Sequence, residues 1–370
     1  MAQKRFGVGI VGLQPDRSWA AVAHAPALRW LPEDYEIIGV ANTTLESAKN
    51  AAAAVGLKRA FADVRELIAA PEVDVVAVTV KVPHHFEIVK AAIEAGKHVY
   101  CEWPLGNGLA EAEELARLAR AKNVLGVVGT QARVAPEIVY LRRLIEDGFV
   151  GEVLSTTIVA RAGVWGGSIP VKHTGAYLLD RANGATMLTI PLGHTLAALT
   201  DVLGRVTELS SVLATRRTQA VALDTGETLP VTAPDQVLVS GLLESGAPIS
   251  IHYRGGSARG QDGLLWEING TEGDMQVTGS SGHAQMVQLS LAGGRGADRD
   301  LNPIKIPPEL RVGWPENVVP GNVARVYARM AADLRNGTRT APTFEDAVAV
   351  HRIIAAIEDA ADKRSRIAIG

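Results

Sequence analysis

The sequence predicts an α/β domain built on a doubly wound parallel sheet, followed by an α+β domain with a mainly antiparallel sheet. The first 130 residues alternate short apolar runs with alanine-rich helical patterns, as a parallel sheet wrapped by helices requires. After residue 130 the runs alternate apolar and polar residues, which is typical of a sheet with one buried face. The 370 residues, 47% of them hydrophobic, suffice for two cores. We therefore expect domains at 1–130 and 131–370.

In the first domain, β-forming runs alternate with helical patterns. The strands are expected at 6–11, 36–41, 73–80, 98–101 and 124–129. The helices are expected at 18–29, 45–55, 64–69, 85–95 and 109–121. This order is that of the Rossmann fold, whose ligands bind at the carboxyl ends of the strands.

The second domain is expected to begin with a helix at 136–147 and to end with helices at 323–334 and 344–362. Between them the sequence predicts strands at 153–160, 236–243, 249–253, 264–268 and 274–277. The glycine-rich run at 292–296 is expected to form a hairpin or a surface loop.

Charge and cysteine content restrict the partners and the compartment. A net charge of -3 gives no electrostatic reason to expect binding to nucleic acid or to an anionic membrane, which favours a small molecule or a protein as partner. The one cysteine, Cys101, excludes an intramolecular disulfide and suits a reducing compartment. No signal region is evident, and no uncharged apolar run approaches the roughly 18 residues that a membrane span needs. We expect a cytoplasmic protein.

The turn after the first strand carries part of a phosphate-binding pattern. Gly7, Gly9 and Gly12 match G-x-G-x-x-G, but the first two fall within the strand, whereas the phosphate-binding turn should follow it. In the turn proper, Gln14 replaces the glycine that lets the backbone approach a pyrophosphate.

A dinucleotide site remains our expectation at this turn. A helix that begins near Ser18 would point free amides at a phosphate, and Arg17 would add a charge-assisted contact. The candidate cofactor-binding residues here are Gly12, Leu13, Gln14, Arg17, Ser18 and Trp19.

The second strand ends in Asn42-Thr43-Thr44, where an acidic residue would ordinarily hold the adenine-side ribose. A carboxylate would repel a 2′-phosphate, and these residues would not. We therefore expect the protein to accept NADP, and not to be strictly selective for NAD. The alternative is that Asn42 and Thr44 simply cap the next helix.

The segment 96–105, at the fourth strand, contains Glu102-Trp103-Pro104. These residues resemble the Glu-Lys-Pro motif of the glucose-fructose oxidoreductase, inositol dehydrogenase and MocA family of NAD(P)-dependent enzymes, in which the lysine touches the reacting hydroxyl and the nicotinamide. Trp103 can pack or stack, but it cannot supply a titratable ammonium. Alternatively, Trp103-Pro104 only anchors a corner between strand and loop.

The resemblance covers nearly the whole chain. Residues 79–85 are similar to a family segment that lies along the nicotinamide half of the cofactor, although Lys81 also fits a solvated surface charge. The resemblance implies cofactor contacts by Val80, Lys81, Val82, Pro83, His85, Glu102, Trp103 and Pro104.

Residues 183–194 resemble a glycine-rich helix start of the family, in which an aspartate precedes a histidine by four residues. The histidine is His194, but the aspartate position holds Ile190. A spacing of four places two side chains on one helical face, as proton transfer requires. A lone histidine among apolar residues is, however, more often a packing residue. We nominate Lys172 and Tyr177 as replacement acid–base residues.

Lys172 and Tyr177 lie in the stretch 161–177, whose cationic and aromatic residues suit a sugar or an acidic metabolite. An ordinary exposed loop explains the stretch equally well.

Two functions follow from these replacements. The segment 101–105, the turn with Gln14, the Asn42-Thr43-Thr44 ending and residues 193–196 resemble the branch of the family that contains the yeast galactose-pathway repressor, a dinucleotide-binding regulator. The chain is either an NAD(P)-dependent oxidoreductase of a sugar, a polyol or a related carbonyl compound with a non-standard catalytic set, or a catalytically inactive dinucleotide sensor with a protein partner. No metal site is expected. The apolar sheet of the second domain predicts a homodimer or homotetramer.

Overall fold

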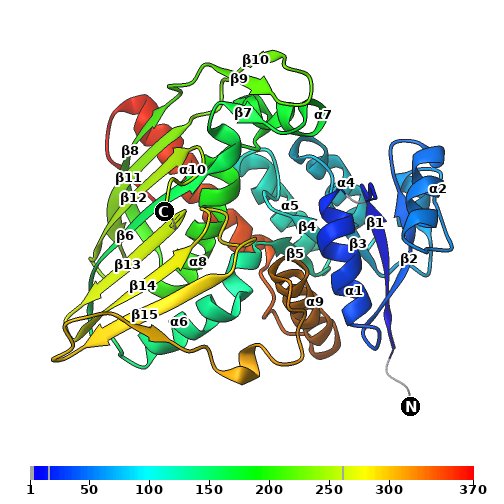
Figure 1. Cartoon of the computed structure of the whole chain (residues 1–370). Coiled ribbons are helices and arrows are strands. Elements are labelled where there is room, and N and C mark those ends of the chain that lie inside the picture. Colours follow the sequence, from blue (N-terminus) through cyan, green and yellow to red (C-terminus); the bar gives the residue numbers. More distant parts are fainter. Residues whose placement is uncertain (1–3, 16, 261) are drawn as a thin grey trace. The chain divides into compact units, whose positions relative to one another are not determined.

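Two units make up the chain in the computed structural model, which describes residues 4–15, 17–260 and 262–370 (Figure 1). The first unit contains residues up to 131 together with 313–349, and the second contains 132–312 and 350–370. The division expected from the sequence at residue 130 differs in one respect, because the chain returns to the first unit after residue 312.

The first unit contains a five-stranded sheet in which every pair of neighbouring strands is parallel, in the order β2-β1-β3-β4-β5. The strands are β1 (Phe6–Val11), β2 (Tyr35–Ala41), β3 (Val75–Val78), β4 (His98–Glu102) and β5 (Gly126–Gly129). All residues of β3 and β5 are buried, as expected for strands covered on both faces. The predicted doubly wound fold is confirmed.

Helices connect these strands. They are α1 (Ala25–Trp30), α2 (Leu45–Ala54), α3 (Val64–Ala69), α4 (His85–Glu94) and α5 (Leu109–Ala121). The helix predicted at 18–29 is wrong in one respect, because a π-helical turn at Ala20–His24 precedes α1. Pro26 has no amide hydrogen to donate, so the hydrogen-bond pattern changes just before it.

The returning segment adds helix α9 (Val318–Asn336) to the first unit, beside α1. The tyrosine rings of Tyr100 and Tyr327 lie with centroids 4.6 Å apart, and the Tyr35 hydroxyl donates to the Tyr327 carbonyl at 2.8 Å. Farther along, Phe344 packs so closely on β5 that a Cβ at Gly126 would lie 2.5 Å from its ring. Contacts between residues more than 200 positions apart therefore complete this core.

The second unit is built on a nine-stranded sheet in the order β16-β15-β14-β13-β6-β12-β11-β8-β17, with only the β12–β6 pair parallel. The strands are β6 (Val153–Ala162), β8 (Val206–Ala214), β11 (Gln236–Leu243), β12 (Pro248–Gly255), β13 (Leu264–Gly270), β14 (Gly273–Gly279), β15 (Leu289–Arg295), β16 (Asn302–Ile304) and β17 (Ile367–Ala368). The predicted mainly antiparallel sheet is confirmed.

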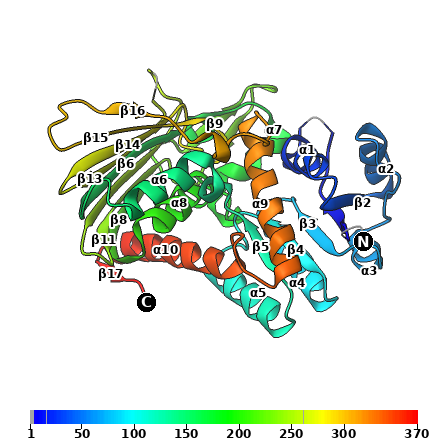
Figure 2. The same ribbon diagram turned by 90° about the horizontal axis from the view of Figure 1, so that it is seen from below.

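Helices α6 (Pro136–Glu146) and α8 (Gly193–Leu203) cover one face of this sheet, together with residues 350–363 of α10 (Phe344–Lys363) (Figure 2). Burial alternates along β11 and β12, as a sheet with one covered face requires. The same unit holds a small sheet of β7 (Ser168–Ile169), β9 (Gln219–Ala222) and β10 (Thr228–Pro230), and the short helix α7 (Lys172–Gly175).

The run 292–296, predicted as a hairpin or a loop, lies mostly in β15, which pairs antiparallel with the next strand, β16; the loop is therefore wrong for most of the run. A Cβ at Gly293 would lie 2.8 Å from Ile304 and 2.9 Å from Phe149. The glycine therefore permits close packing within a strand and does not mark a turn.

The expectation that no long apolar run exists also needs correction. Among the described residues, the helical stretch Arg181–Leu203 is long enough to span a membrane and has a mean hydropathy of 1.2. Because 78% of its apolar window is buried inside the structure, it has the character of a core helix.

Candidate functional site

The turn after β1 depends on Gly12. Its φ of 100° is in the range that favours glycine, and a Cβ would lie 2.7 Å from Val80. Gly7 and Gly9 lie inside β1, where a Cβ at either would strike neighbouring atoms. The absence of a side chain at Gly7 and Gly9 therefore permits close packing against the strand. Only Gly12 belongs to the turn.

Gln14 and Ser18 hold this turn closed. The Gln14 amide donates to the Ser18 hydroxyl at 2.8 Å, and that hydroxyl donates to the Gln14 carbonyl at 2.9 Å. The Gln14 side chain also donates to the Ser47 hydroxyl at 2.9 Å. The side chains of Gln14 and Ser18 are thus already engaged within the chain, whereas Arg17, the predicted charge-assisted phosphate contact, is exposed. Leu13 is fully buried.

In the side-chain amide of Asn42, at the end of β2, the nitrogen is hydrogen-bonded and the oxygen is not. Its Nδ2 donates inward to the Leu13 carbonyl at 2.8 Å and to the Ser47 hydroxyl at 3.1 Å. Its Oδ1 is buried, and no hydrogen-bond partner for it exists within the described part of the chain. Since an unpaired buried acceptor is costly, Oδ1 is suited to a donor from outside the chain, such as a ribose hydroxyl.

The neighbours of Asn42 have other roles. The Thr44 hydroxyl caps α2 by accepting from the Ser47 amide at 3.1 Å, and Thr43 is exposed. Across the turn, Nε1 of Trp19 is a buried donor for which the described residues offer no acceptor.

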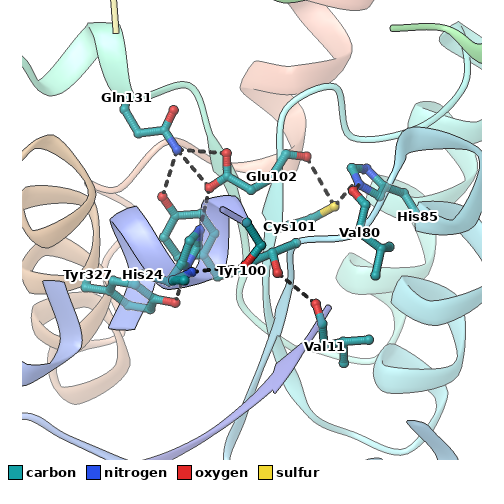
Figure 3. Close-up of polar contacts among 12 residues, drawn as sticks. Val11, His24, Val80, His85, Tyr100, Cys101, Glu102, Gln131 and Tyr327 are labelled. Atoms are coloured by element: carbon teal, nitrogen blue, oxygen red, sulfur yellow. Dashed lines mark hydrogen bonds and ion pairs between the residues drawn. The ribbon is translucent and has the colours of Figure 1, made fainter. Parts of the chain in front are cut away.

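The segment after β3 links the ends of neighbouring strands. The Thr79 hydroxyl donates to the Val11 carbonyl at 2.8 Å (Figure 3). A 3-10 turn at Val82–His84 follows, in which Val82 is buried, and both Lys81 and Pro83 are exposed.

His85, the first residue of α4, joins this segment to β4. Its Nδ1 lies 2.7 Å from the Pro104 carbonyl, and its Nε2 lies 3.0 Å from the Val80 carbonyl. Burial lowers the pKa of His85, so the neutral imidazole donates through one nitrogen only. We assign the proton to Nδ1, whose contact is shorter. His85 therefore positions the two strand ends.

Trp103 and Pro104 are both buried at the end of β4, and the peptide bond between them is cis. Only 5% of Trp103 is exposed. A buried indole thus occupies the position at which the resembling family has its lysine.

Glu102 is the centre of a hydrogen-bond network (Figure 3). Nε2 of His24 lies 2.7 Å from its Oε1, and Nε2 of Gln131 donates to its two oxygens at 2.8 and 2.9 Å. The Gln131 amide also donates to the Tyr100 hydroxyl at 3.3 Å, and Nδ1 of His24 lies 2.8 Å from the Tyr327 hydroxyl.

The protons of this network can be assigned from the tyrosines. Burial raises the pKa of Tyr100 and of Tyr327 well above 10, so both phenols stay protonated. Tyr327 then donates to Nδ1 of His24, whose Nε2 donates to the Glu102 carboxylate. His24 and Gln131 thus hold the Glu102 carboxylate from two sides, and Tyr327 in turn holds His24.

Gln131 and Thr130 follow β5 and carry two further buried polar atoms. Because Nε2 of Gln131 faces the carboxylate of Glu102, the orientation of the amide is fixed. Its Oε1 and the Thr130 hydroxyl have no partner among the residues that the structure describes. Donors and acceptors thus follow β1, β2 and β5, and this set fits the hydroxyls and the amide of a dinucleotide laid along the carboxyl ends of the strands.

In the second unit, His194 lies buried near the start of α8. Burial lowers its pKa to about 3, and the nearby His283 contributes to the shift. Its Nδ1 is buried and has no partner in the described regions. His194 is therefore neutral at pH 7 and retains an unused polar atom.

The other two candidate catalytic residues have different surroundings. The Lys172 ammonium is paired with Glu227, and its backbone amide donates to Asp224 at 3.0 Å. Tyr177 is partly buried, and burial raises its pKa, so its phenol is protonated. A catalytic role for His194, Lys172 or Tyr177 stays a prediction.

Sequence reasoning did not identify His24, Gln131, Tyr327 or His283. His24 and Gln131 contact Glu102, and Tyr327 contacts His24, all from distant parts of the chain, so no spacing along the sequence could have indicated them. Among the described residues, no three His, Cys, Asp or Glu side chains are grouped so that they could hold a metal ion.

Comparisons with known proteins agree with this architecture. A family profile described as the oxidoreductase family with an NAD-binding Rossmann fold matches residues 6–130, and one described as the Gal80p C-terminal domain matches residues 136–279. Dehydrogenase aclE of Aspergillus oryzae is 32% identical over 372 residues, covering 96% of this chain and 95% of that protein. The galactose/lactose metabolism regulatory protein GAL80 of Kluyveromyces lactis is 30% identical over 302 residues, covering 77% and 66% respectively.

Solved structures show the same fold. The transcriptional regulator Gal80p from Kluyveromyces lactis has a TM-score of 0.89 at 26% identity, covering 100% of this chain and 95% of that chain. Levoglucosan dehydrogenase in complex with NADH and L-sorbose has a TM-score of 0.85 at 24% identity, with 99% of both chains covered. In sequence, levoglucosan dehydrogenase from Pseudarthrobacter phenanthrenivorans is 25% identical over 398 residues, which cover 97% of this chain and 96% of that protein. This chain belongs to the glucose-fructose oxidoreductase, inositol dehydrogenase and MocA oxidoreductase family, with an NAD-binding Rossmann domain followed by a C-terminal domain of the Gal80p type.

Proposed function

We propose that the protein binds NAD(H) or NADP(H) along the carboxyl ends of the strands of its first unit and acts as an oxidoreductase on a sugar, a polyol or a related carbonyl compound. The observation that carries this proposal is a group of four buried polar atoms that follow strands of the parallel sheet and have no partner among the described residues. These atoms are Trp19 Nε1, Asn42 Oδ1, Thr130 Oγ1 and Gln131 Oε1. Each follows a strand of the parallel sheet, where ligands of this fold bind.

Two of these groups are assigned to particular parts of the cofactor. Asn42 accepts a hydrogen bond from the adenine-side ribose, and Gln131 accepts one from the carboxamide at the nicotinamide end. Glu102 and His24 keep the Gln131 amide in the orientation that presents its oxygen. When bound, the nicotinamide supplies the hydride acceptor or donor.

The residues after β2 support acceptance of NADP(H). None of Asn42, Thr43 and Thr44 carries a charge, so they would not repel a 2′-phosphate as a carboxylate would.

Oxidation of a hydroxyl also requires a group that takes its proton. His194 is neutral and can accept a hydrogen bond, but a pKa of about 3 makes it a weak base. In the reverse direction, reduction of a carbonyl, the protonated Tyr177 phenol or Lys172, paired with Glu227, would donate the proton that the new hydroxyl needs. On this account turnover is slow compared with that of a family member that has the lysine.

A second candidate function, a dinucleotide sensor with a protein partner, is favoured by the same replacements. Trp103 stands buried where the family has a lysine, Ile190 stands where it has an aspartate, and one relative is a regulatory protein.

To separate the two functions, the absorbance of the reduced cofactor would be followed with a panel of sugars and polyols. Turnover that is lost in Tyr177→Phe or Lys172→Ala supports the enzyme, and cofactor binding without turnover supports the sensor.

The outer face of the large sheet is the surface that we propose for homo-oligomerisation. Val212 and Leu238 are direct cross-strand neighbours and are 57% and 40% exposed. The row continues through His252, Val159 and Leu265 on adjacent strands. A continuous band of this kind fits a two-fold contact between copies of the sheet.

A further inference from the structure

The carboxylate of Glu102 is a largely buried charge at the end of β4, and only 12% of its side chain is exposed. Within the described part of the chain, its one ion-pair contact is to His24, whose Nε2 lies 2.7 Å from its Oε1. Its other side-chain donor is the uncharged amide of Gln131, at 2.8 and 2.9 Å. The net charge of this group therefore depends on the protonation of His24.

His24 is held neutral by Tyr327. The His24 side chain is fully buried, and its Nδ1 lies 2.8 Å from the Tyr327 hydroxyl. The described residues give that hydroxyl no other acceptor, and a buried hydroxyl without an acceptor is costly, so its hydrogen points at Nδ1. An Nδ1 that accepts a hydrogen bond carries no proton, so the ring is not a cation. The negative charge of Glu102 is thus not cancelled by His24.

Groups beside Glu102 are affected by the same charge. Burial is the main cause of the raised pKa of Tyr100 and of Cys101, and the negative charge of Glu102 raises both further. No lysine or arginine of the described chain contributes to either shift. The next residue after Glu102 is the uncharged Trp103. The field at this end of β4 is therefore negative.

Gln131 connects this charge to the proposed nicotinamide end of the site. Its Nε2 donates to Glu102, whereas its buried Oε1 is the atom that we propose for the carboxamide of the cofactor. A Cβ at Gly129 would lie 2.7 Å both from Nε2 of Gln131 and from Oε1 of Glu102, so the two side chains are held in close contact. The nicotinamide ring then lies one amide group away from the carboxylate.

We propose that the uncompensated carboxylate of Glu102 makes the nicotinamide end of this site selective for the oxidised, positively charged dinucleotide over the reduced, uncharged ring. This inference rests on the proposed function, because it specifies the redox state of the cofactor bound at the same site. Glu102 is a specificity-determining residue in this account. An elementary charge at this separation, in a partly buried site, changes an affinity by about tenfold.

The selectivity has a consequence for each of the two candidate functions. By thermodynamic linkage, a site that prefers the oxidised form makes the bound dinucleotide harder to reduce. In the enzyme, this favours reduction of a carbonyl over oxidation of a hydroxyl. In the sensor, it makes occupancy of the site follow the oxidised fraction of the cofactor pool.

The test is calorimetric titration of the full chain with NAD⁺, NADH, NADP⁺, NADPH and ADP-ribose. We expect the wild type to bind the oxidised member of each redox pair more tightly than the reduced member. Glu102→Gln should weaken binding of the oxidised member about tenfold, because the attraction between the charges is lost. Binding of the reduced member should change by less than about threefold. ADP-ribose lacks the nicotinamide and should bind both proteins equally.

Glu94→Gln is the matched control. It removes the charge of an exposed carboxylate at the end of α4, in the same unit, and should leave the ratio of the two affinities unchanged. The thermal midpoint and the ADP-ribose affinity show that the Glu102 variant is folded. The comparison of oxidised and reduced cofactor on the wild type needs no variant.

Two results would overturn the inference. One is a wild type that binds the reduced members as tightly as the oxidised ones, or more tightly. The other is a Glu102→Gln protein that loses affinity for both members equally, since that outcome means that Glu102 only supports the structure of the site. Failure of the proposed function is distinct, because none of the four dinucleotides would then bind.

Discussion

At the scale of single residues, the informative feature of the first unit is which buried polar atoms find partners and which do not. Gln14, Ser18 and Thr44 were predicted to meet the cofactor, yet their hydrogen bonds close the β1 turn and cap α2. Asn42 was predicted from its place after the second strand, and its Oδ1 is still available. Gln131 could not be predicted, because its orientation depends on Glu102, 29 positions away.

Replacement of Asn42 tests this assignment. Asn42→Ala should weaken binding of NADH and NADPH alike by about threefold to tenfold, since one hydrogen bond to a ribose is lost from both. Asn42→Asp should weaken NADPH more than NADH, because a carboxylate repels the 2′-phosphate. Isothermal titration calorimetry measures both affinities. The exposed Thr43→Ala is the control, and an Asn42→Ala protein that binds both cofactors as the wild type does would exclude Asn42 from the site.

At the scale of elements, the accuracy of the sequence predictions follows the clarity of the pattern. β1 and α5 were predicted to the residue, because their apolar runs end at glycine, charged or capping residues. β8 was missed, since its burial does not alternate, and β15 was missed, since its paired glycines indicate a loop in sequence. The extent of α9 was underestimated because Pro320 and Gly321 stand in its first turns, where proline is tolerated.

The end of α9 offers a prediction for stability. The Asp333 carboxylate accepts hydrogen bonds from the backbone of Thr340 at 2.9 Å and Ala341 at 2.8 Å, and from the Thr338 hydroxyl at 2.6 Å. It thereby holds the segment that leads to the bridge between Val127 and Thr343. Asp333→Ala should lower the free energy of unfolding by about 2–4 kcal/mol, measured by urea denaturation. A loss below about 0.5 kcal/mol would contradict this role.

The same carboxylate predicts a pH dependence. Burial opposes ionisation of Asp333, but the hydrogen bonds from Thr338, Ala341 and Thr340 outweigh it and lower the pKa of this carboxyl. Its contribution to stability is therefore complete above the unfolded pKa of about 3.9 and is lost as pH falls through the lower folded value. The difference in stability between wild type and Asp333→Asn should shrink as pH falls below about 4. A difference that is constant from pH 7 to pH 2.5 would contradict it.

At the scale of the whole molecule, the chain combines an NAD-binding Rossmann domain with a Gal80p-type second domain. The fold class was predictable from periodicity, because each sheet repeats its own burial pattern over many residues. The return of 313–349 to the first unit was not, because the helical pattern of α9 says nothing about which sheet the helix covers.

Assembly is the property that belongs to this scale. Leu238→Glu would place a charge in the exposed apolar row on the outer sheet face, next to Val212. We expect light scattering to show a dimer or larger oligomer for the wild type and a monomer for the variant. The thermal midpoint of the variant should fall only by the amount that association contributes. Ser240→Glu places the same charge at an exposed position on the same strand but outside the apolar row. Comparison of the two variants by light scattering shows whether the interface extends beyond that row. A wild-type monomer would remove the proposed interface.

Cofactor binding by the first unit is the claim on which the account depends, and titration of the purified protein with NADH and with NADPH tests it most directly. Energy transfer from tryptophan to the reduced nicotinamide and calorimetry would be recorded on the same samples, with Trp19→Phe as the matched variant. The account predicts saturable binding of one dinucleotide per chain, weakened in the variant through loss of the indole donor. Absence of binding by either cofactor in both measurements would contradict it.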